Sequence, residues 1–180
     1  MSAQDGLITC RTPTVGDAIQ LAQVATTAWQ VGFRGLLPQV FLDQLDTSRS
    51  LARWRADLVR EREAPPYFLV VEQGGVVVGF SAFGPSRDLD AQSSVAELFA
   101  IHVAPTSWGR GAGSELLQRT MSQFRASGFS GASLWVIDGN ARARTFYERH
   151  GWHFDGTERT TTRLADFPLR ELRYQIDLGP

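Results

Sequence analysis

Three closely spaced glycines, Gly109, Gly111 and Gly113, form the stretch of this sequence whose chemistry is easiest to foresee. The apolar residues before them predict a strand, and the pattern after them predicts a helix. A glycine turn that enters a helix exposes several backbone N–H groups, and the helix dipole adds positive potential at the same point. The segment therefore predicts a binding site for a ligand that carries phosphate.

Two familiar phosphate motifs do not fit this turn. A dinucleotide-binding fold would need G-x-G-x-x-G near the first strand, with an acidic residue about 20 positions later. Here position 114 is a serine, and the glycines lie well past the middle of the chain. A nucleoside triphosphate loop needs a lysine, yet all 18 basic residues are arginines. A loop whose glycines serve only tight packing stays open as the alternative.

Glu97 is the candidate for a general base. It is the one charge in an otherwise apolar alternating row that includes Phe99 and Ile101. Burial in such a row makes a carboxylate a better proton acceptor. The alternative is a salt bridge between Glu97 and one of the arginines. His102 and Asp138 are weaker candidates for the same role.

Tyr147 and Asn140 lie seven positions apart, so a helix that begins at Asn140 places both on one face, together with Arg144. Asn140 follows a turn at Asp138-Gly139 and could simply cap the helix. Tyr147 could be a core aromatic residue with a satisfied hydroxyl.

Composition limits the classes of protein to which the chain can belong. Its 180 residues suit one domain, with 43% hydrophobic and 21% charged residues, as is ordinary for a globular protein. A net charge of −1 argues against nucleic acid as a partner, and no apolar run suits a signal peptide or a membrane span. The single cysteine, Cys10, excludes an internal disulfide, and the sequence contains no Cys/His cluster that would suggest a metal site. A cytoplasmic setting is therefore expected.

The elements that must position these side chains alternate between helix and strand. After a cap at Thr14, helices are predicted up to residue 29 and over 38–45, 47–63, 111–126 and 141–150. Strands are predicted over 7–11, 67–73, 76–83, 95–103, 132–137, 152–160 and 170–178. The third helix carries a basic face of Arg53, Arg55, Arg60 and Arg62.

Connection lengths predict how the strands pair. Gly74-Gly75 joins two β-rich runs and indicates a hairpin. The long helical connection from strand 95–103 to strand 132–137 suits a parallel pair, whereas the last two strands suit antiparallel neighbours. The prediction is an α/β fold in which helices cover both faces of a mixed sheet.

One run of the sequence, Val103-x-Pro105-x-x-x-Gly109-x-Gly111-x-Gly113, is followed by Asn140 and then by Phe146-Tyr-Glu-Arg-His-Gly-Trp152. This combination resembles the GNAT superfamily of N-acetyltransferases. The family's motif Q/R-x-x-G-x-G/A falls on residues 108–113, where Trp108 replaces the usual Gln or Arg. The backbone N–H groups of the turn are unaffected by that departure.

The resemblance covers nearly the whole chain and is most specific between residues 97 and 152. It implies a single GNAT domain over residues 1–180. Its fold would be a mixed, mostly antiparallel sheet of six to seven strands with a splayed parallel pair, flanked by about four or five helices.

The same resemblance implies acetyl-CoA as cofactor and coenzyme A as product. The diphosphate would contact the turn formed by Gly109, Arg110, Gly111, Ala112, Gly113 and Ser114. The pantetheine arm would pair with the backbone of Ile101, His102 and Val103. Asn140, Arg144 and Tyr147 would also contact the cofactor.

The reaction that the family implies is direct attack of a primary amine on the thioester in a ternary complex, with no metal. Glu97 would accept a proton, directly or through water, and Tyr147 would protonate the departing thiolate. A domain that binds acyl-CoA without catalysis, or one that transfers a longer acyl group, stays open as an alternative.

The acceptor, a small-molecule or peptide amine, would lie in the family's pocket near the first two helices. That implies Trp29 and Phe33, with Leu36 and Leu37, opposite residues 160–167, although such aromatic residues are more often core. Asp155 and Asp166 could attract a cationic amine. A homodimer through exposed C-terminal strands is expected on family analogy alone.

Overall fold

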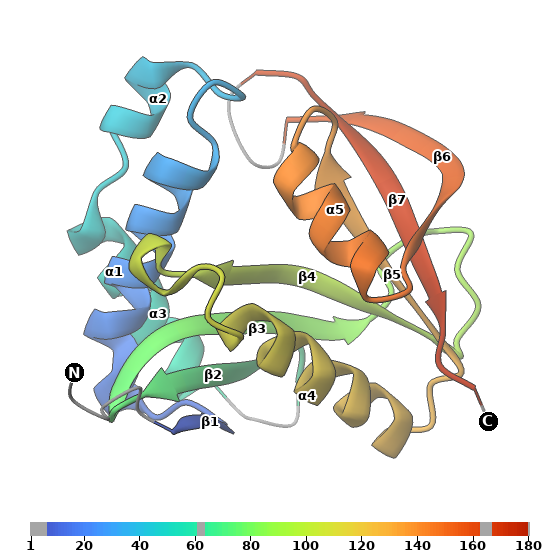
Figure 1. The fold of residues 1–180 in the computed structure, drawn as a ribbon, viewed down its shortest axis with the longest axis horizontal. Coiled ribbons are helices and arrows are strands. Elements are labelled where there is room, and N and C mark those ends of the chain that lie inside the picture. Colours follow the sequence, from blue (N-terminus) through green and yellow to red (C-terminus); the bar gives the residue numbers. More distant parts are fainter. Residues whose placement is uncertain (1–6, 61–63, 163–166, 180) are drawn as a thin grey trace. The chain divides into compact units, whose positions relative to one another are not determined.

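The chain forms seven β-strands and five α-helices within the residues that the structure, a computed structural model, describes, namely 7–60, 64–162 and 167–179 (Figure 1). The strands are β1 (Ile8–Arg11), β2 (Tyr67–Gln73), β3 (Val76–Pro85), β4 (Val95–Val103), β5 (Gly131–Ile137), β6 (His153–Thr161) and β7 (Leu169–Asp177). The α-helices are α1 (Ala18–Gly32), α2 (Gln39–Asp43), α3 (Thr47–Val59), α4 (Ala112–Ala126) and α5 (Ala141–Arg149); two short 3₁₀ turns are η1 (Val15–Asp17) and η2 (Pro105–Ser107). Within these ranges, no helix is long and apolar enough to cross a membrane.

The strands form a mixed sheet in the order β1-β2-β3-β4-β5-β7-β6. β4 and β5 run parallel, with residues 95–98 paired to residues 131–134, and β4 continues beyond this register to Val103. The pairs β1–β2, β2–β3, β5–β7 and β6–β7 are antiparallel. The connection from β4 to β5 contains α4, the kind of long crossover that a parallel pair requires. The predicted mixed sheet with a parallel pair is confirmed.

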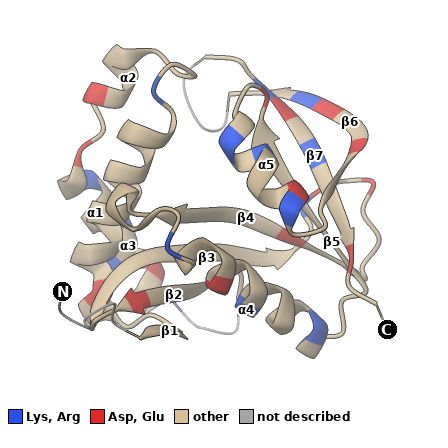
Figure 2. Ribbon diagram, viewed as in Figure 1, with Lys and Arg blue, Asp and Glu red and all other residues tan. Residues whose placement is uncertain are grey.

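The chain divides into two compact units: unit 1 comprises residues 1–83 and 100–122, and unit 2 comprises residues 84–99 and 123–180. In unit 1, α1 and α3 lie side by side (Figure 1). A buried cluster joins Leu21 of α1, Trp54 of α3, and Val70 and Phe80 of the β2–β3 hairpin. The ring centroids of Trp54 and Phe80 are 4.7 Å apart. Helix α1 contains no charged residue, as its uniform tan colour in Figure 2 shows.

The entry to α1 is fixed by a buried carboxylate. Asp17 accepts hydrogen bonds from the backbone N–H of Thr14 at 2.6 Å and from both terminal nitrogens of Arg11 at 2.8 Å. The bond from Arg11 is the main reason why the pKa of Asp17 falls to about 2. Thr14 therefore does mark the start of helical structure, although a 3₁₀ turn precedes the α-helix.

In unit 2, α5 lies against the strands and is joined to β7 by a hydrogen bond from Arg144 Nε to the Tyr174 hydroxyl at 3.0 Å. Bands of both charges cross β6 and β7 in Figure 2. One cross-strand ion pair joins Arg159 Nε to Glu171 Oε2 at 2.7 Å, and opposite charges facing each other stabilise such a pair of strands.

Three predicted helix ends are wrong by two residues or more. Helix α1 continues to Gly32 and not only to residue 29, because the N–H of Phe33 still bonds to the carbonyl of Trp29 at 3.1 Å. Helix α2 ends at Asp43 and not at residue 45, because Asp46 has an extended backbone and caps α3 by accepting the N–H of Ser48 at 2.8 Å. Helix α3 ends at Val59 and not at residue 63, because Arg60 has an extended backbone. Residues 61–63, which include the predicted basic-face member Arg62, lie outside the described residues.

Gly79 allows β3 to approach β4 closely within unit 1. A Cβ atom at this position would lie 2.8 Å from the carbonyl oxygen of His102 and 3.0 Å from methyl groups of Val103 and Val71. The register of β2 with β3 shifts at this point, because Val71 pairs with Gly79 whereas Glu72 pairs with Val77. The missing side chain thus sets the distance between the two backbones.

We predict that Gly79→Ala lowers the free energy of unfolding by about 2 kcal/mol, because the new methyl group must displace main-chain atoms. Chemical denaturation measures this loss. Gly131→Ala is the matched control, since its Cβ would have its nearest neighbour at 3.6 Å, an ordinary contact. Equal losses in the two variants would contradict the role assigned to Gly79.

Candidate active site

The glycine turn lies in unit 1 between β4 and α4. Gly109 and Gly111 have φ angles of 71° and 89°, values that side chains other than glycine adopt only with strain. Helix α4 then begins at Ala112, and the N–H of Glu115 already bonds to the carbonyl of Gly111 at 3.0 Å. The predicted combination of glycine turn and helix start is therefore present, with its N–H groups oriented along the start of a 15-residue helix.

Trp108 connects this turn to the end of β4. Its indole Nε1–H donates to the carbonyl of Val103 at 2.7 Å. The N–H of Ala104 donates to the carbonyl of Val78 at the same distance, so the end of β4 is also bonded to β3. The sequence left position 108 without a role because its side chain departs from the family motif.

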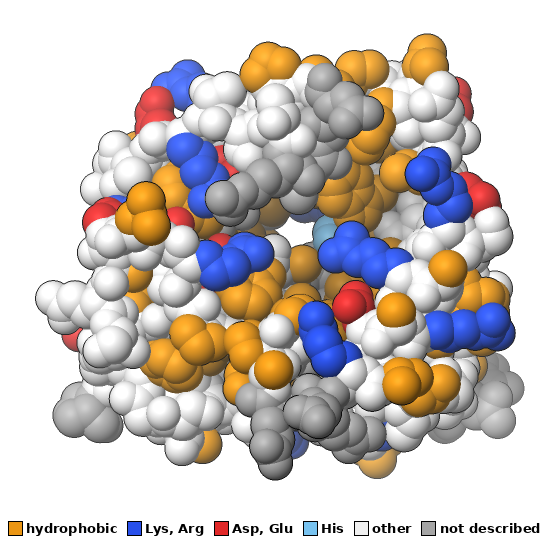
Figure 3. All heavy atoms as spheres, turned by 180° about the vertical axis from the view of Figure 1, so that it is seen from behind, with side chains coloured by type: hydrophobic (Ala, Val, Ile, Leu, Met, Phe, Trp, Pro, Cys, Tyr) orange, Lys and Arg blue, Asp and Glu red, His pale blue; other side chains and the backbone are white. Residues whose placement is uncertain are grey.

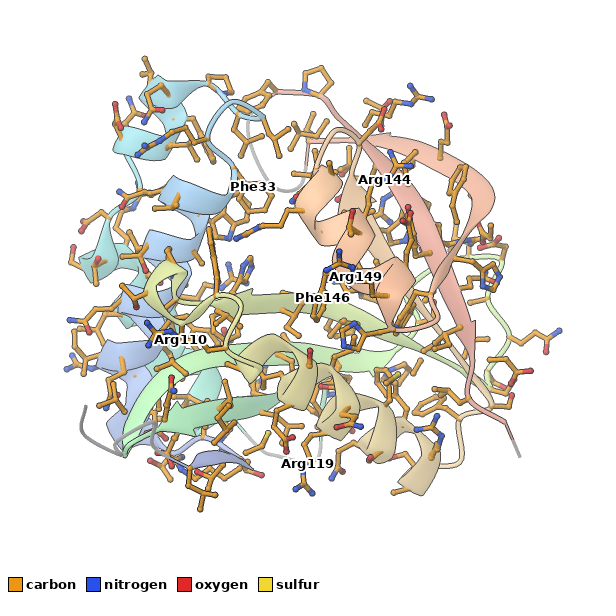
Figure 4. All side chains as sticks on the ribbon, viewed as in Figure 1. Phe33, Arg110, Arg119, Arg144, Phe146 and Arg149 are labelled. Carbon is orange, nitrogen blue, oxygen red and sulfur yellow. The ribbon has the colours of Figure 1, made fainter. Side chains whose placement is uncertain are left out.

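Three arginines project from different elements of the two units. In Figure 4, Arg110 extends from the turn before α4, Arg119 from α4, and Arg144 from α5. Arg110 is exposed, whereas Arg119 is paired with Glu115 at 2.8 Å. On the face drawn in Figure 3, charged side chains of both signs lie among hydrophobic and uncharged ones.

Trp29 and Phe33, the predicted acceptor contacts, form an aromatic pair at the end of α1, with centroids 4.7 Å apart. His102 of β4 joins them, with centroids 6.2 Å from Trp29 and 6.5 Å from Phe33. The ring of Phe41 also lies 6.4 Å from Trp29. The cluster is only partly buried. Sequence reasoning found Trp29 and Phe33 but missed Phe41 and the ring of His102.

Glu97 lies in unit 2 with only 2% of its surface exposed, and it forms an ion pair with Arg87. Its Oε2 accepts the backbone N–H and the Nε–H of Arg87 at 2.9 and 3.1 Å, and its Oε1 accepts Nη2 at 2.6 Å. The same guanidinium lies 3.9 Å from the ring centroid of Phe99. The salt-bridge alternative for Glu97 is thus present, and its role as a base remains a prediction.

Tyr147 is buried in unit 2, with its ring 5.4 Å from Phe146 and 6.2 Å from Trp152. Burial raises the pKa of its phenol well above the usual value. Asn140, at the start of the same helix, caps α5 by accepting the N–H of Ala143 at 3.1 Å. The cap predicted as the alternative for Asn140 is therefore present, Tyr147 is buried as a core aromatic residue would be, and contact of either with a cofactor stays a prediction.

Two other charged residues have protein partners within unit 2. Arg144 bonds to the Tyr174 hydroxyl and lies 3.6 Å from Asp138, so a phosphate would have to compete with these groups. Asp155 is paired with the buried Arg173 at 2.7 Å, an arrangement that does not favour its predicted attraction for a cationic amine. Asp166, named with it, lies outside the described residues, as do residues 163–166 of the predicted acceptor loop.

The predicted residues fall in two sets. Unit 1 brings together the aromatic pair, the backbone of Ile101, His102 and Val103, and the glycine turn. Unit 2 contains Glu97, Asn140, Arg144 and Tyr147. Arg87 was missed altogether because no local pattern links it to a strand residue ten positions later. Gly79 carried a signal that could have been used, since a glycine inside a strand often marks close backbone approach.

Sheet topology, the parallel pair and the glycine turn together support one class of protein, an acyltransferase with a CoA-based cofactor. The chain belongs to the acetyltransferase (GNAT) family, whose model matches residues 29–152. An N-acetyltransferase of Bacillus subtilis, YuaI, described as uncharacterized, is 27% identical over 134 residues, which cover 74% of each chain. Mycothiol acetyltransferase of Acidimicrobium ferrooxidans is 36% identical over 101 residues, 54% of this chain and 32% of that one.

Solved structures show the same fold. The PaiA N-acetyltransferase of Thermoplasma acidophilum, in complex with coenzyme A, has a TM-score of 0.77 at 17% identity, over 95% of this chain and 99% of that chain. YncA of Salmonella typhimurium, solved with acetyl-CoA, has a TM-score of 0.69 at 22% identity, over 97% and 95%. The resemblance inferred from the glycine motif is confirmed at the level of family and fold.

We predict that Arg87→Met lowers the free energy of unfolding by about 3 kcal/mol, because it leaves the buried Glu97 carboxylate without its partner. Adding Glu97→Gln to that variant should restore part of the loss, since the uncompensated charge is then absent. Arg53→Met is the control: Arg53 is 86% exposed and its pair with Asp57 is 3.6 Å long. Urea denaturation compares the three, and a loss no larger than the control's would be inconsistent with this account.

A second prediction concerns alkaline pH. Because burial raises the pKa of Tyr147 in the folded state above its ordinary value of about 10, the unfolded chain loses this proton first. Ionisation of Tyr147 therefore leaves the free energy of unfolding unchanged below about pH 10. Above that pH it lowers the free energy of unfolding by up to about 1.4 kcal/mol per pH unit. Denaturation at a series of pH values should show a shallower decline for Tyr147→Phe than for the parent protein. Parallel curves would refute the prediction.

Proposed function

We propose that this protein transfers the acetyl group of acetyl-CoA to a primary amine, by direct attack in a ternary complex and within one GNAT domain. The observation that carries the proposal is the glycine turn, with two residues at positive φ, that leads into α4 in a chain of this family. The proposal includes the reducing, cytoplasmic setting expected from the single cysteine.

The cofactor part of the proposal rests on unit 1. The diphosphate would accept hydrogen bonds from the N–H groups of the turn, where the dipole of α4 favours a negative charge. Arg110, exposed in the same turn, adds a permanent cation. The amides of the pantetheine arm would pair with backbone groups of Ile101, His102 and Val103, in the way that an added strand does.

The chemical part rests on unit 2. As the amine nitrogen bonds to the thioester carbon, it becomes positively charged and must lose a proton. When the carbon–sulfur bond breaks, the departing thiolate must gain one. A tyrosine phenol, with an ordinary pKa of about 10, is protonated at neutral pH and can supply the second proton, although burial raises the pKa of Tyr147 and so makes its phenol a weaker acid.

Glu97 is proposed to take the first proton. A carboxylate offers about four lone-pair positions, and Arg87 donates three hydrogen bonds to Glu97. One position on Oε1 is therefore left for a water molecule or an amine. Glu97 would take the proton through this position, either directly from the amine or through one water molecule.

The acceptor proposed here is a small amine or a peptide N-terminus whose apolar part contacts Trp29 and Phe33. These rings are half-buried and belong to an aromatic cluster with Phe41 and His102. Rings that present partly exposed faces bind flat or aliphatic groups by burying their surface. A homodimer remains part of the proposal on family analogy.

Titration calorimetry with coenzyme A tests the proposal, with Gly109→Ala and Gly128→Ala as a matched pair. Both glycines have positive φ, 71° and 82°, and open space where a Cβ would lie. Each substitution should therefore cost similar strain, roughly 1 kcal/mol. We predict that Gly109→Ala weakens coenzyme A binding about tenfold or more, because it alters the phosphate-binding turn, whereas Gly128→Ala, beyond the other end of α4, leaves the affinity unchanged. Failure of the parent protein to bind coenzyme A would refute the assignment.

Catalysis is tested separately by release of thiol from acetyl-CoA over a panel of amines. Tyr147→Phe should lower the rate roughly 100-fold, as loss of a general acid does, while coenzyme A still binds. Binding in the parent protein without transfer to any amine would point instead to an acyl-CoA sensor or scaffold. Transfer only from longer acyl-CoA donors would redirect the proposal to another acyl group.

A further inference from the structure

We propose that Trp108 is a positioning residue for the cofactor: its indole N–H holds the phosphate-binding turn of unit 1 against the end of β4. The inference rests on the proposed function, because it assumes that the turn contacts the diphosphate. It assigns a role to the one motif position at which the sequence departs from the family pattern. At that position a Gln or Arg is usual, and here a half-buried Trp is found.

A short hydrogen bond carries the inference, and it links the end of β4 to the glycine turn. The Nε1–H of Trp108 donates to the carbonyl oxygen of Val103 at 2.7 Å, which is at the short end of the range for such bonds. Val103 is the last residue of β4, and Trp108 directly precedes Gly109, where the turn begins. The bond therefore closes a short loop around η2 and fixes where the turn starts.

The end of β4 is itself held in place. The N–H of Ala104 bonds to the carbonyl of Val78 in β3 at 2.7 Å. Gly79, the next residue of β3, lets the two backbones approach so closely that a methyl group would lie 2.8 Å from the carbonyl of His102. Main-chain contacts with β3 thus fix the end of β4, and the side chain of Trp108 fixes the turn relative to β4.

The turn needs such a restraint because of its composition. Gly109 and Gly111 gain their positive φ angles without strain, but glycine also allows many other conformations. A ligand that binds a loose turn must first order it, and this cost weakens the affinity. A side-chain bond at the start of the turn lowers the cost before the ligand arrives. The restraint acts on the turn that would contact the diphosphate, whereas the strand end that would pair with the pantetheine arm is held by a main-chain bond to β3.

The test compares two ligands by calorimetry: coenzyme A, which has the diphosphate, and pantetheine, which lacks it. Trp108→Phe keeps an aromatic ring, removes the N–H donor and trims the indole, a loss of volume that the control variant below shares. We expect it to weaken coenzyme A binding roughly three- to tenfold, the effect of losing one hydrogen bond, while pantetheine affinity stays within about twofold of the parent value, a change of under 0.5 kcal/mol. Trp108→Leu serves for the same comparison if the Phe variant does not fold.

Trp54→Phe is the control, because it trims an indole in the core of the same unit. It should lower thermal stability and leave the affinity for both ligands unchanged. Equal losses of coenzyme A and pantetheine affinity in Trp108→Phe would show a general structural role and overturn the inference. Unchanged coenzyme A affinity would overturn it as well. If the parent protein binds neither ligand, the proposed function fails instead.

Discussion

Close contact between two backbones, at Gly79 of β3 and His102 of β4, is the constraint on which the rest of unit 1 depends. At 2.8 Å from a carbonyl oxygen there is no space for a methyl group, so only glycine can occupy the position without displacing a strand. The residues that follow His102 are then tied to β3 by Ala104 and to the turn by Trp108. Because main-chain contacts fix the end of β4, the N–H groups of the glycine turn that follows have defined positions.

Unit 2 shows a different constraint, the need to compensate a buried charge. Glu97 is removed from solvent, and Arg87 balances it with three hydrogen bonds while its own side chain stays 53% exposed. A carboxylate held in this way is fixed in orientation, which helps proton transfer, but it has few lone pairs left for a substrate. The ion pair with Arg87 and the proposed role as a base thus make opposing demands on this one side chain.

Sequence reasoning succeeded where structure is set by neighbours along the chain. The hairpin at Gly74-Gly75, the cap at Asn140 and the turn before α4 depend on a few adjacent residues, and each was found. It failed where contacts join distant residues. No pattern in one sequence indicates that Arg87 would pair with Glu97, or that Asp155 would be neutralised by Arg173 from another strand. The end of α2 was misjudged for a local reason, because the extended backbone of Asp46, which caps the following helix, stops α2 at Asp43.

Cys10, in β1, is half-buried near Glu115, and burial, with a smaller contribution from that carboxylate, raises the pKa of its thiol to about 11. At neutral pH, only roughly one molecule in ten thousand would carry the thiolate form. Since the thiolate is the nucleophile, the protein's sole sulfhydryl is a poor competitor for an activated acyl group. In the acetyl transfer proposed for this protein, loss of donor to its own sulfur would thereby be suppressed, and sulfhydryl detected by a colour reagent would report released coenzyme A with little background from the polypeptide.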